Sequence, residues 1–168
     1  MLPLLFLKQF TKAYTKLGNM SVIWFDKSFS VAQLEGLEKN TMAEQLGIEW
    51  SEVGPDFIRA RMPVDRRTLQ PYGLLHGGAS VALAETIGSI GAAMTVDKDK
   101  FIAVGIEINA NHVRSARNGF VMGTARPIHT GSTTQVWDIR IEDEKGKLIC
   151  VSRLTVAILK KPEQPVHP

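Results

Sequence analysis

The chain has 168 residues, a length that suits one domain with a substantial hydrophobic core. Its 44% hydrophobic and 22% charged residues are typical of a globular protein and exclude a disordered or fibrous chain. The net charge of +3 comes from three lysines within residues 1–19, because residues 20–168 hold 17 basic and 17 acidic side chains. A neutral domain has no global field that would collect nucleic acid, so we expect no nucleic-acid partner.

Residues 1–20 are predicted to be an extension outside the fold, and Met20 is a candidate for the natural start. The alternative is a short amphipathic helix, because four side chains recur at helical spacing: Phe6, Phe10, Tyr14 and Leu17. The apolar run over residues 1–7 is too short to span a bilayer, and it lacks the features of a signal peptide. We therefore expect no membrane partner and a cytoplasmic location, with one domain over residues 21–160 and a polar tail over 161–168.

Two short helices and a strand are predicted in the first part of this domain. Ser30 is a candidate N-cap for a helix that runs to Asn40, and Thr41 for a second helix that ends at Gly47. Residues 57–62 alternate between apolar and basic side chains, which predicts a half-buried strand.

A long helix is predicted over residues 79–94, which are rich in Ala and contain no Lys or Arg, so that the helix should be buried on every side. Four strand-like runs follow, over residues 101–112, 119–128, 133–142 and 147–159. Short connections between successive strands favour an antiparallel meander. The predicted fold class is α+β, an antiparallel sheet wrapped around one long buried helix.

Glu85 is the single acidic residue of the predicted long helix, and no basic residue lies three or four positions from it. An unpaired buried carboxylate is energetically unfavourable, so such a group either finds partners elsewhere or marks a site. One interpretation is a structural carboxylate that hydrogen-bonds Ser89 one turn later. The other is a catalytic base or nucleophile that faces a substrate pocket.

The sequence His76-Gly77-Gly78 comes just before the predicted helix and offers backbone N–H groups to a carbonyl oxygen that becomes an oxyanion. Gly77 and Glu85 are eight residues apart, roughly 12 Å along a helix. A reacting carbonyl must lie about 3 Å from both the oxyanion donor and the nucleophile. We therefore predict a composite site, with Gly77 from one subunit of a homodimer and Glu85 from the other.

The single cysteine, Cys150, excludes an internal disulfide and a cysteine-based zinc site. It lies in an alternating apolar run, which favours a packed thiol over a nucleophile. The histidines show no metal-ligand spacing in any pair of His76, His112, His129 and His167, so we expect no metal.

The segment QPYGLLHGG over residues 70–78, followed by ALAET over residues 82–86, resembles the hotdog-fold acyl-CoA thioesterases. The likeness runs from about Trp24 to Leu159 and includes the strings NTMAEQLGIE, MPVD, GIEINANHVR and SRLTVA. It is greatest for the bacterial group that hydrolyses 1,4-dihydroxy-2-naphthoyl-CoA in menaquinone biosynthesis or proofreads aryl carrier protein in enterobactin synthesis. The 4-hydroxybenzoyl-CoA thioesterases of the Arthrobacter type are more distant.

The resemblance implies a role for each matching residue. Glu85 would attack the thioester or activate water, and the sequence leaves these two alternatives open. Gly77 would donate its N–H to the thioester oxygen from the opposite subunit. Gln70 and His76 would orient the carbonyl or the water, and Ser89 would lie near the reacting centre. The resemblance also implies a homotetramer and no cofactor beyond the CoA of the substrate.

Residues for binding CoA are predicted after the long helix, at the end of one strand and in a later turn: Asn109, Asn111, His112, Arg114, His129, Gly131 and Ser132. The planar fork of Arg114 suits the phosphates of CoA, although the alternative is a solvated surface charge. Relatives carry a second histidine after the one that matches His112, and Val113 stands there in this chain.

We expect a thioester hydrolase that acts on an aromatic acyl-CoA, with 1,4-dihydroxy-2-naphthoyl-CoA as one candidate. Alternatives within the enzyme class are an acyl or aryl carrier protein substrate, a medium-chain acyl-CoA, or hotdog hydratase chemistry. A noncatalytic acyl-CoA-binding regulator is the alternative of another class. Such a regulator would need a DNA-binding segment, and we do not expect residues 1–19 to form a helix-turn-helix module.

Overall fold

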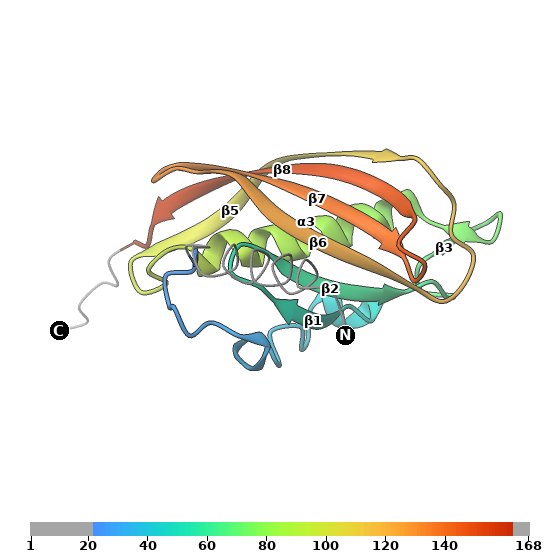
Figure 1. Cartoon of the computed structure of the whole chain (residues 1–168), viewed down its shortest axis with the longest axis horizontal. Coiled ribbons are helices and arrows are strands. Elements are labelled where there is room, and N and C mark those ends of the chain that lie inside the picture. The colour runs from blue at the N-terminus through green and yellow to red at the C-terminus, as the bar shows by residue number, and fades with distance from the viewer. Residues whose placement is uncertain (1–21, 163–168) are drawn as a thin grey trace, which may run out of the picture.

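The computed structural model describes residues 22–162, so the predicted N-terminal extension and residues 163–168 of the predicted tail lie outside the described residues. An antiparallel sheet of six strands curves around one long helix, α3 (Gly77–Met94), as Figure 1 shows. The strands of this sheet are β1 (Glu49–Val53), β2 (Ile58–Pro63), β5 (Phe101–His112), β6 (Phe120–Thr130), β7 (Thr134–Asp143) and β8 (Leu148–Lys160). The α+β architecture, with a sheet wrapped around one long helix, is as predicted.

The strands follow the order β1-β2-β6-β7-β8-β5. The predicted meander is confirmed for β6, β7 and β8, but it is wrong for β5, which pairs with β8. The reason is that β6 already has β2 and β7 on its two sides, so β5 takes the remaining edge of the sheet. The segment 113–119 therefore crosses the end of the fold, where the Leu75 N–H donates to the Ala116 carbonyl over 2.8 Å.

Of the two helices predicted before α3, one forms and the other does not. α2 (Met42–Leu46) is confirmed: Thr41 Oγ1 accepts from a backbone N–H of the first turn, and Gly47 ends the helix in a left-handed conformation. The helix predicted over residues 31–40 is wrong, because only one 3₁₀ turn forms there, η1 (Val31–Gln33). At Gly36 the backbone turns to a φ of +88°, which no right-handed helix accommodates.

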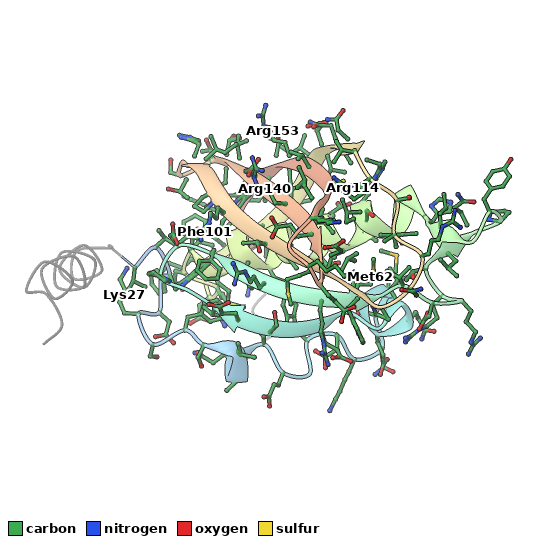
Figure 2. All side chains as sticks on the ribbon, turned by 45° about the vertical axis from the view of Figure 1, so that its right-hand side comes forward. Lys27, Met62, Phe101, Arg114, Arg140 and Arg153 are labelled. Atoms are coloured by element: carbon green, nitrogen blue, oxygen red, sulfur yellow. The ribbon has the colours of Figure 1, made fainter. Side chains whose placement is uncertain are left out.

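The two faces of the sheet differ in character. The side that faces α3 is apolar, and its fully buried side chains include Ile58, Val121, Trp137 and Leu154. The outer face carries charged side chains, among them Arg140 and Arg153, which point away from the helix in Figure 2. This pattern identifies the space between α3 and the sheet as the hydrophobic core.

Helix α3 begins two residues earlier than predicted and is not buried on every side, so that part of the prediction is wrong. Its buried face is made largely of small residues, which let the sheet come close to the helix backbone: Ala79, Ser80, Leu83, Ala84, Ile87, Gly88, Gly91, Ala92 and Met94. The opposite face of this helix leaves Glu85 exposed and Ala82, Thr86 and Ser89 half-buried. In a single chain, therefore, no sheet or helix fully covers the face of α3 that carries Glu85.

The variant Gly91→Ala is expected to lower the free energy of unfolding, although alanine is the better helix former by about 1 kcal/mol. A Cβ at Gly91 would lie 2.9 Å from Cζ3 of Trp137, whose fully buried indole stacks on Trp24. Overpacking of this kind costs about 1–3 kcal/mol. Urea unfolding followed by circular dichroism measures the change, and an unchanged midpoint would show that the indole shifts aside.

Candidate active site

A cavity of about 370 Å³ lies at the N-terminus of α3, and we call it the N-terminal cavity. It brings together the helix start, the end of β5, the segment after it, and a short hairpin of β3 (Leu69–Gln70) and β4 (Leu74–Leu75). Four of the predicted site residues line it: Gln70, Gly77, His112 and Arg114. Ser80 and Ser115, which were not predicted as site residues, line it as well.

The start of α3 is built for a backbone donor. His76 is the N-cap, and its Nδ1 accepts the N–H of Gly78 over 2.8 Å. The Gly77 N–H, one residue earlier, has no acceptor among the hydrogen bonds of residues 22–162. A Cβ at Gly77 would lie 2.7 Å from Nε2 of His112, so a larger residue there would have to displace the imidazole. The cavity thus offers one unpaired N–H at the positive end of the helix.

Gln70 and Arg114 border the same cavity from two different elements. The Oε1 of Gln70 accepts the N–H of Tyr72 over 2.6 Å, which fixes the orientation of the side-chain amide. The –NH₂ group of the same amide therefore remains as a hydrogen-bond donor. Arg114 lies two residues after the end of β5 and is exposed (Figure 2). An exposed guanidinium beside the cavity is chemically suited to an anionic group of a ligand.

A second cavity of about 280 Å³ lies on the open face of α3, and we call it the Glu85 cavity. It contains Glu85 and Ser89 of the predicted site. Its other walls come from α2, from β1 and from the segment before α2: Leu37, Glu38, Thr41, Met42, Ala43 and Trp50. With Ala82, Thr86 and Ile90 from the helix itself, most of the lining is apolar.

Glu85 is not held as a structural carboxylate. Within residues 22–162 it forms no ion pair, and no hydrogen bond joins it to Ser89. Its Oε1 lies 3.0 Å from the position that a Cβ at Gly105 would occupy, beside the irregularity where β5 shifts register. The carboxylate therefore reaches from the helix towards the free edge of the sheet, where glycine leaves room for it.

Gly77 and Glu85 line different cavities, as the estimate of roughly 12 Å along the helix requires. The N-terminal cavity has the backbone donor and polar side chains, whereas the Glu85 cavity has the carboxylate and an apolar wall. In a single chain, therefore, neither cavity holds both groups needed to attack a polarised carbonyl.

The remaining predicted binding residues line neither cavity. Asn109 and Asn111 lie on β5, and the Asn109 amide donates to Glu107 over 3.2 Å. The other three, His129, Gly131 and Ser132, lie at the turn between β6 and β7, separated from segment 113–119 by the whole of β6. Eleven residues of strand amount to roughly 36 Å. Their contact with CoA stays a prediction.

Residues 22–162 contain no group of three or more His, Cys, Asp or Glu side chains placed to hold a metal ion. No helix in this part of the chain is long and apolar enough to span a membrane.

The Cys150 thiol is expected to be unreactive in the folded chain. It is fully buried in β8, as predicted, and burial raises its pKa. A raised pKa keeps the thiol protonated at neutral pH, and the reactive form is the thiolate. A disulfide reagent such as DTNB should therefore react slowly with the native protein and rapidly in denaturant. Equal rates in both conditions would contradict this placement.

The family model of the thioesterase superfamily matches residues 72–150. The chain belongs to this superfamily, with the hotdog fold, and is a thioester hydrolase. It is 51% identical over 138 residues to the 1,4-dihydroxy-2-naphthoyl-CoA hydrolase of Escherichia coli, covering 82% of this chain and 100% of that one. It is 45% identical to the proofreading thioesterase EntH of Cronobacter turicensis, with 82% and 99% covered.

Solved structures of related proteins have the same fold. A glutamine-to-alanine variant of the thioesterase PA1618 from Pseudomonas aeruginosa superposes with a TM-score of 0.80 at 45% identity, covering 83% of this chain and 99% of that one. The Staphylococcus aureus protein SAV0944 is represented by a glutamate-to-alanine variant (TM-score 0.69, 45% identity, 71% and 99% covered). A glutamine-to-alanine variant of the same protein has a TM-score of 0.68, with 45% identity and 72% and 98% covered.

Proposed function

We propose that this thioesterase hydrolyses the thioester of an aromatic acyl-CoA. The observation that carries the proposal is the Glu85 cavity, in which a carboxylate and Ser89 lie beside a wall of large apolar side chains that includes Trp50. Such a wall suits an aryl group held next to the reacting carbonyl. The name of the Escherichia coli relative, a 1,4-dihydroxy-2-naphthoyl-CoA hydrolase, supports an aromatic substrate and a place in menaquinone biosynthesis.

The proposed active site is composite and forms in a homodimer. Gly77 of one subunit polarises the carbonyl, and Glu85 of the other attacks it or activates water. The separation of the two groups into different cavities supports this arrangement. The free edge of β5 provides a surface for pairing, because Val104 is 44% and Ile106 61% exposed on a strand paired on one side only.

The roles of Glu85 and Gln70 gain support from the Staphylococcus aureus protein. The glutamine and the glutamate that were replaced by alanine in SAV0944 lie fifteen positions apart in that chain, the same separation as Gln70 and Glu85 here. We propose that Gln70 orients the carbonyl through its –NH₂ group. His76 would fix the loop by capping the helix, and Ser89 would lie near the attacked carbon.

The CoA part of the substrate would lie on the N-terminal cavity side, with Arg114 at its phosphates. The reaction needs water and the groups named above, so we propose no metal and no cofactor beyond the CoA of the substrate. CoA esters are metabolites of the cytoplasm, which is where we propose that the enzyme acts. We also propose that two such dimers assemble into a homotetramer.

A carrier-protein substrate is the second candidate. The relative in Cronobacter turicensis is named a proofreading thioesterase, and its 45% identity to this chain supports hydrolysis of an aryl or acyl group from a carrier protein. Carrier proteins and CoA present the same phosphopantetheine arm, so the same two cavities would serve both substrates.

A thiol-release assay with a substrate panel tests the proposal. The panel contains benzoyl-CoA, 1,4-dihydroxy-2-naphthoyl-CoA, a medium-chain acyl-CoA, and aroyl and acyl carrier proteins. We expect kcat/KM to be highest for an aroyl-CoA. A higher value for the carrier-protein thioesters would favour the second candidate, and a higher value for the medium-chain ester would overturn the aromatic assignment.

A further inference from the structure

Two large apolar side chains are exposed in the wall of the Glu85 cavity. Met42, the first residue of α2, is 61% exposed, and Leu37, five residues earlier, is 45% exposed. Both line the cavity, so a ligand inside it can reach them. The half-buried side chains of Trp50 and Ile90 line the same cavity. A cluster of exposed apolar side chains, unlike a single one, marks a binding surface.

The start of α2 holds Met42 in a fixed place. Thr41 is the N-cap of this helix, and its Oγ1 accepts the N–H of Ala43 over 3.2 Å. The carboxylate of Glu44 accepts the N–H of Asn40 over 2.8 Å. Paired side-chain contacts of this kind close the first turn of a helix. Met42 is therefore carried by a fixed turn, and the structure leaves its side chain uncovered there.

The free polar groups of the cavity lie on a different element from these apolar side chains. Five polar side chains line the cavity, and three of them already form hydrogen bonds within the chain: Glu38, Thr41 and Thr86. The other two, Glu85 and Ser89, belong to α3, and no hydrogen bond among residues 22–162 engages their side chains. The cavity thus has a polar side on α3 and an apolar side on α2, the same polarity as an acyl thioester.

We propose that Met42 and Leu37 determine substrate specificity by packing on the part of the acyl group that lies farthest from its carbonyl. This inference rests on the proposed function, because it places the carbonyl at Glu85 and the aryl group in the Glu85 cavity. A second, fused ring would extend to α2 and cover Met42, whereas a single ring held at the same carbonyl extends less far.

The occupant we assign to this wall is the acyl group and not the second subunit. The proposed dimer pairs through β5, and β1, which follows α2 in the chain, lies at the opposite edge of the sheet. Strand pairing at β5 therefore does not use the edge that carries α2.

Methionine oxidation measures whether a ligand covers Met42. Hydrogen peroxide converts an accessible thioether to the sulfoxide, and peptide mass spectrometry quantifies each methionine separately. The probes are CoA analogues with a naphthyl or a phenyl ketone, in which a methylene group replaces the thioester sulfur. Met42 should oxidise rapidly in the free enzyme and about tenfold more slowly with the naphthyl analogue, because a covered thioether reacts only when the ligand leaves.

Met62, which is fully buried, is the internal reference and should oxidise slowly in every sample. A Met42 that is already protected in the free enzyme would show that another part of the protein covers it, and the inference would fail. It would also fail if the naphthyl analogue protected Met42 no better than the phenyl analogue.

Steady-state kinetics of Met42→Ala test the specificity itself. The variant removes most of the apolar contact, so kcat/KM for 2-naphthoyl-CoA should fall about tenfold, while the value for benzoyl-CoA stays within about threefold. The matched control is Leu159→Ala, which removes a side chain of similar exposure (47%) from the end of β8, outside both cavities. An unchanged ratio in Met42→Ala, or an equal change in the control, would overturn the inference.

Failure of this inference is distinguishable from failure of the proposed function. If the wild-type enzyme hydrolyses neither 2-naphthoyl-CoA nor benzoyl-CoA, the proposed function fails. If it hydrolyses both and Met42→Ala keeps their ratio, the function stands and only the role of Met42 is lost.

Discussion

Replacement of Glu85 by glutamine is expected to lower kcat by at least about a hundredfold, with a much smaller change in KM. The amide keeps the size of the side chain but removes both the negative charge of the nucleophile and the basicity of a general base, which contributes about 10²–10⁴-fold. Because Glu85 is exposed and lines a cavity, the variant should lose little stability compared with its loss of activity. Thiol release under saturating aroyl-CoA measures the effect.

The control lies in the same cavity. Glu38→Gln also removes a carboxylate from the lining, but that carboxylate is engaged by the Gly36 N–H, and kcat should stay within about threefold of wild type. Near-normal turnover of Glu85→Gln would refute the assignment of the catalytic group. Single-turnover hydrolysis in H₂¹⁸O then separates the two chemical roles, because only a covalent intermediate puts the label into the Glu85 carboxylate.

The variant Gly77→Pro is expected to lower kcat by about 10²–10³-fold, the loss measured when one oxyanion donor is removed. Gly77 is the first residue of α3, where proline fits a helix, and His76 before it has φ −71° and ψ 132°, which proline accepts in a preceding residue. The matched control is Gly77→Ala, which adds the same Cβ beside His112 but keeps the N–H. Equal losses in both variants would mean that crowding, and not the missing donor, is the cause.

A mixture of the two inactive variants tests whether one site draws on two subunits. Subunits of Gly77→Pro and Glu85→Gln that are unfolded together and refolded should recover about a quarter of wild-type activity. Random pairing makes half of the dimers mixed, and each mixed dimer has one intact site. A mixture that remains as inactive as its components would place Gly77 and Glu85 of the same chain at one substrate.

The long helix and the four strands after it could be predicted from the sequence, because each is a long run whose residue pattern favours one type of secondary structure. Glu85 was a candidate site residue because no basic residue could pair with it in a helix expected to be buried on every side, whereas the structure shows this side chain exposed. Periodicity reports only how apolar a face is. A face made of alanine, serine and threonine looks the same whether it is covered by its own sheet or left open.

The walls of the Glu85 cavity were beyond sequence reasoning for a different reason. β1 contains only Trp50 and Val53 as apolar residues in five, and its register shifts after Trp50, so no alternation marks it as a strand. The short helix α2 was predicted correctly, but nothing in its composition says that it would lie against α3. Contacts between elements that lie far apart along the chain depend on the order of the strands in the sheet. The same order puts β5 at the edge of the sheet and not beside β6.

That edge has a consequence for the protein in the cell. A lone protomer exposes the twelve-residue strand β5 with unpaired backbone groups and the apolar side chains Ile102, Val104 and Ile106, a surface open to mispairing with other chains. Newly made protomers that find no partner would be substrates for chaperones and proteases. Charged substitutions along β5 should therefore reduce the abundance of the protein as well as its activity.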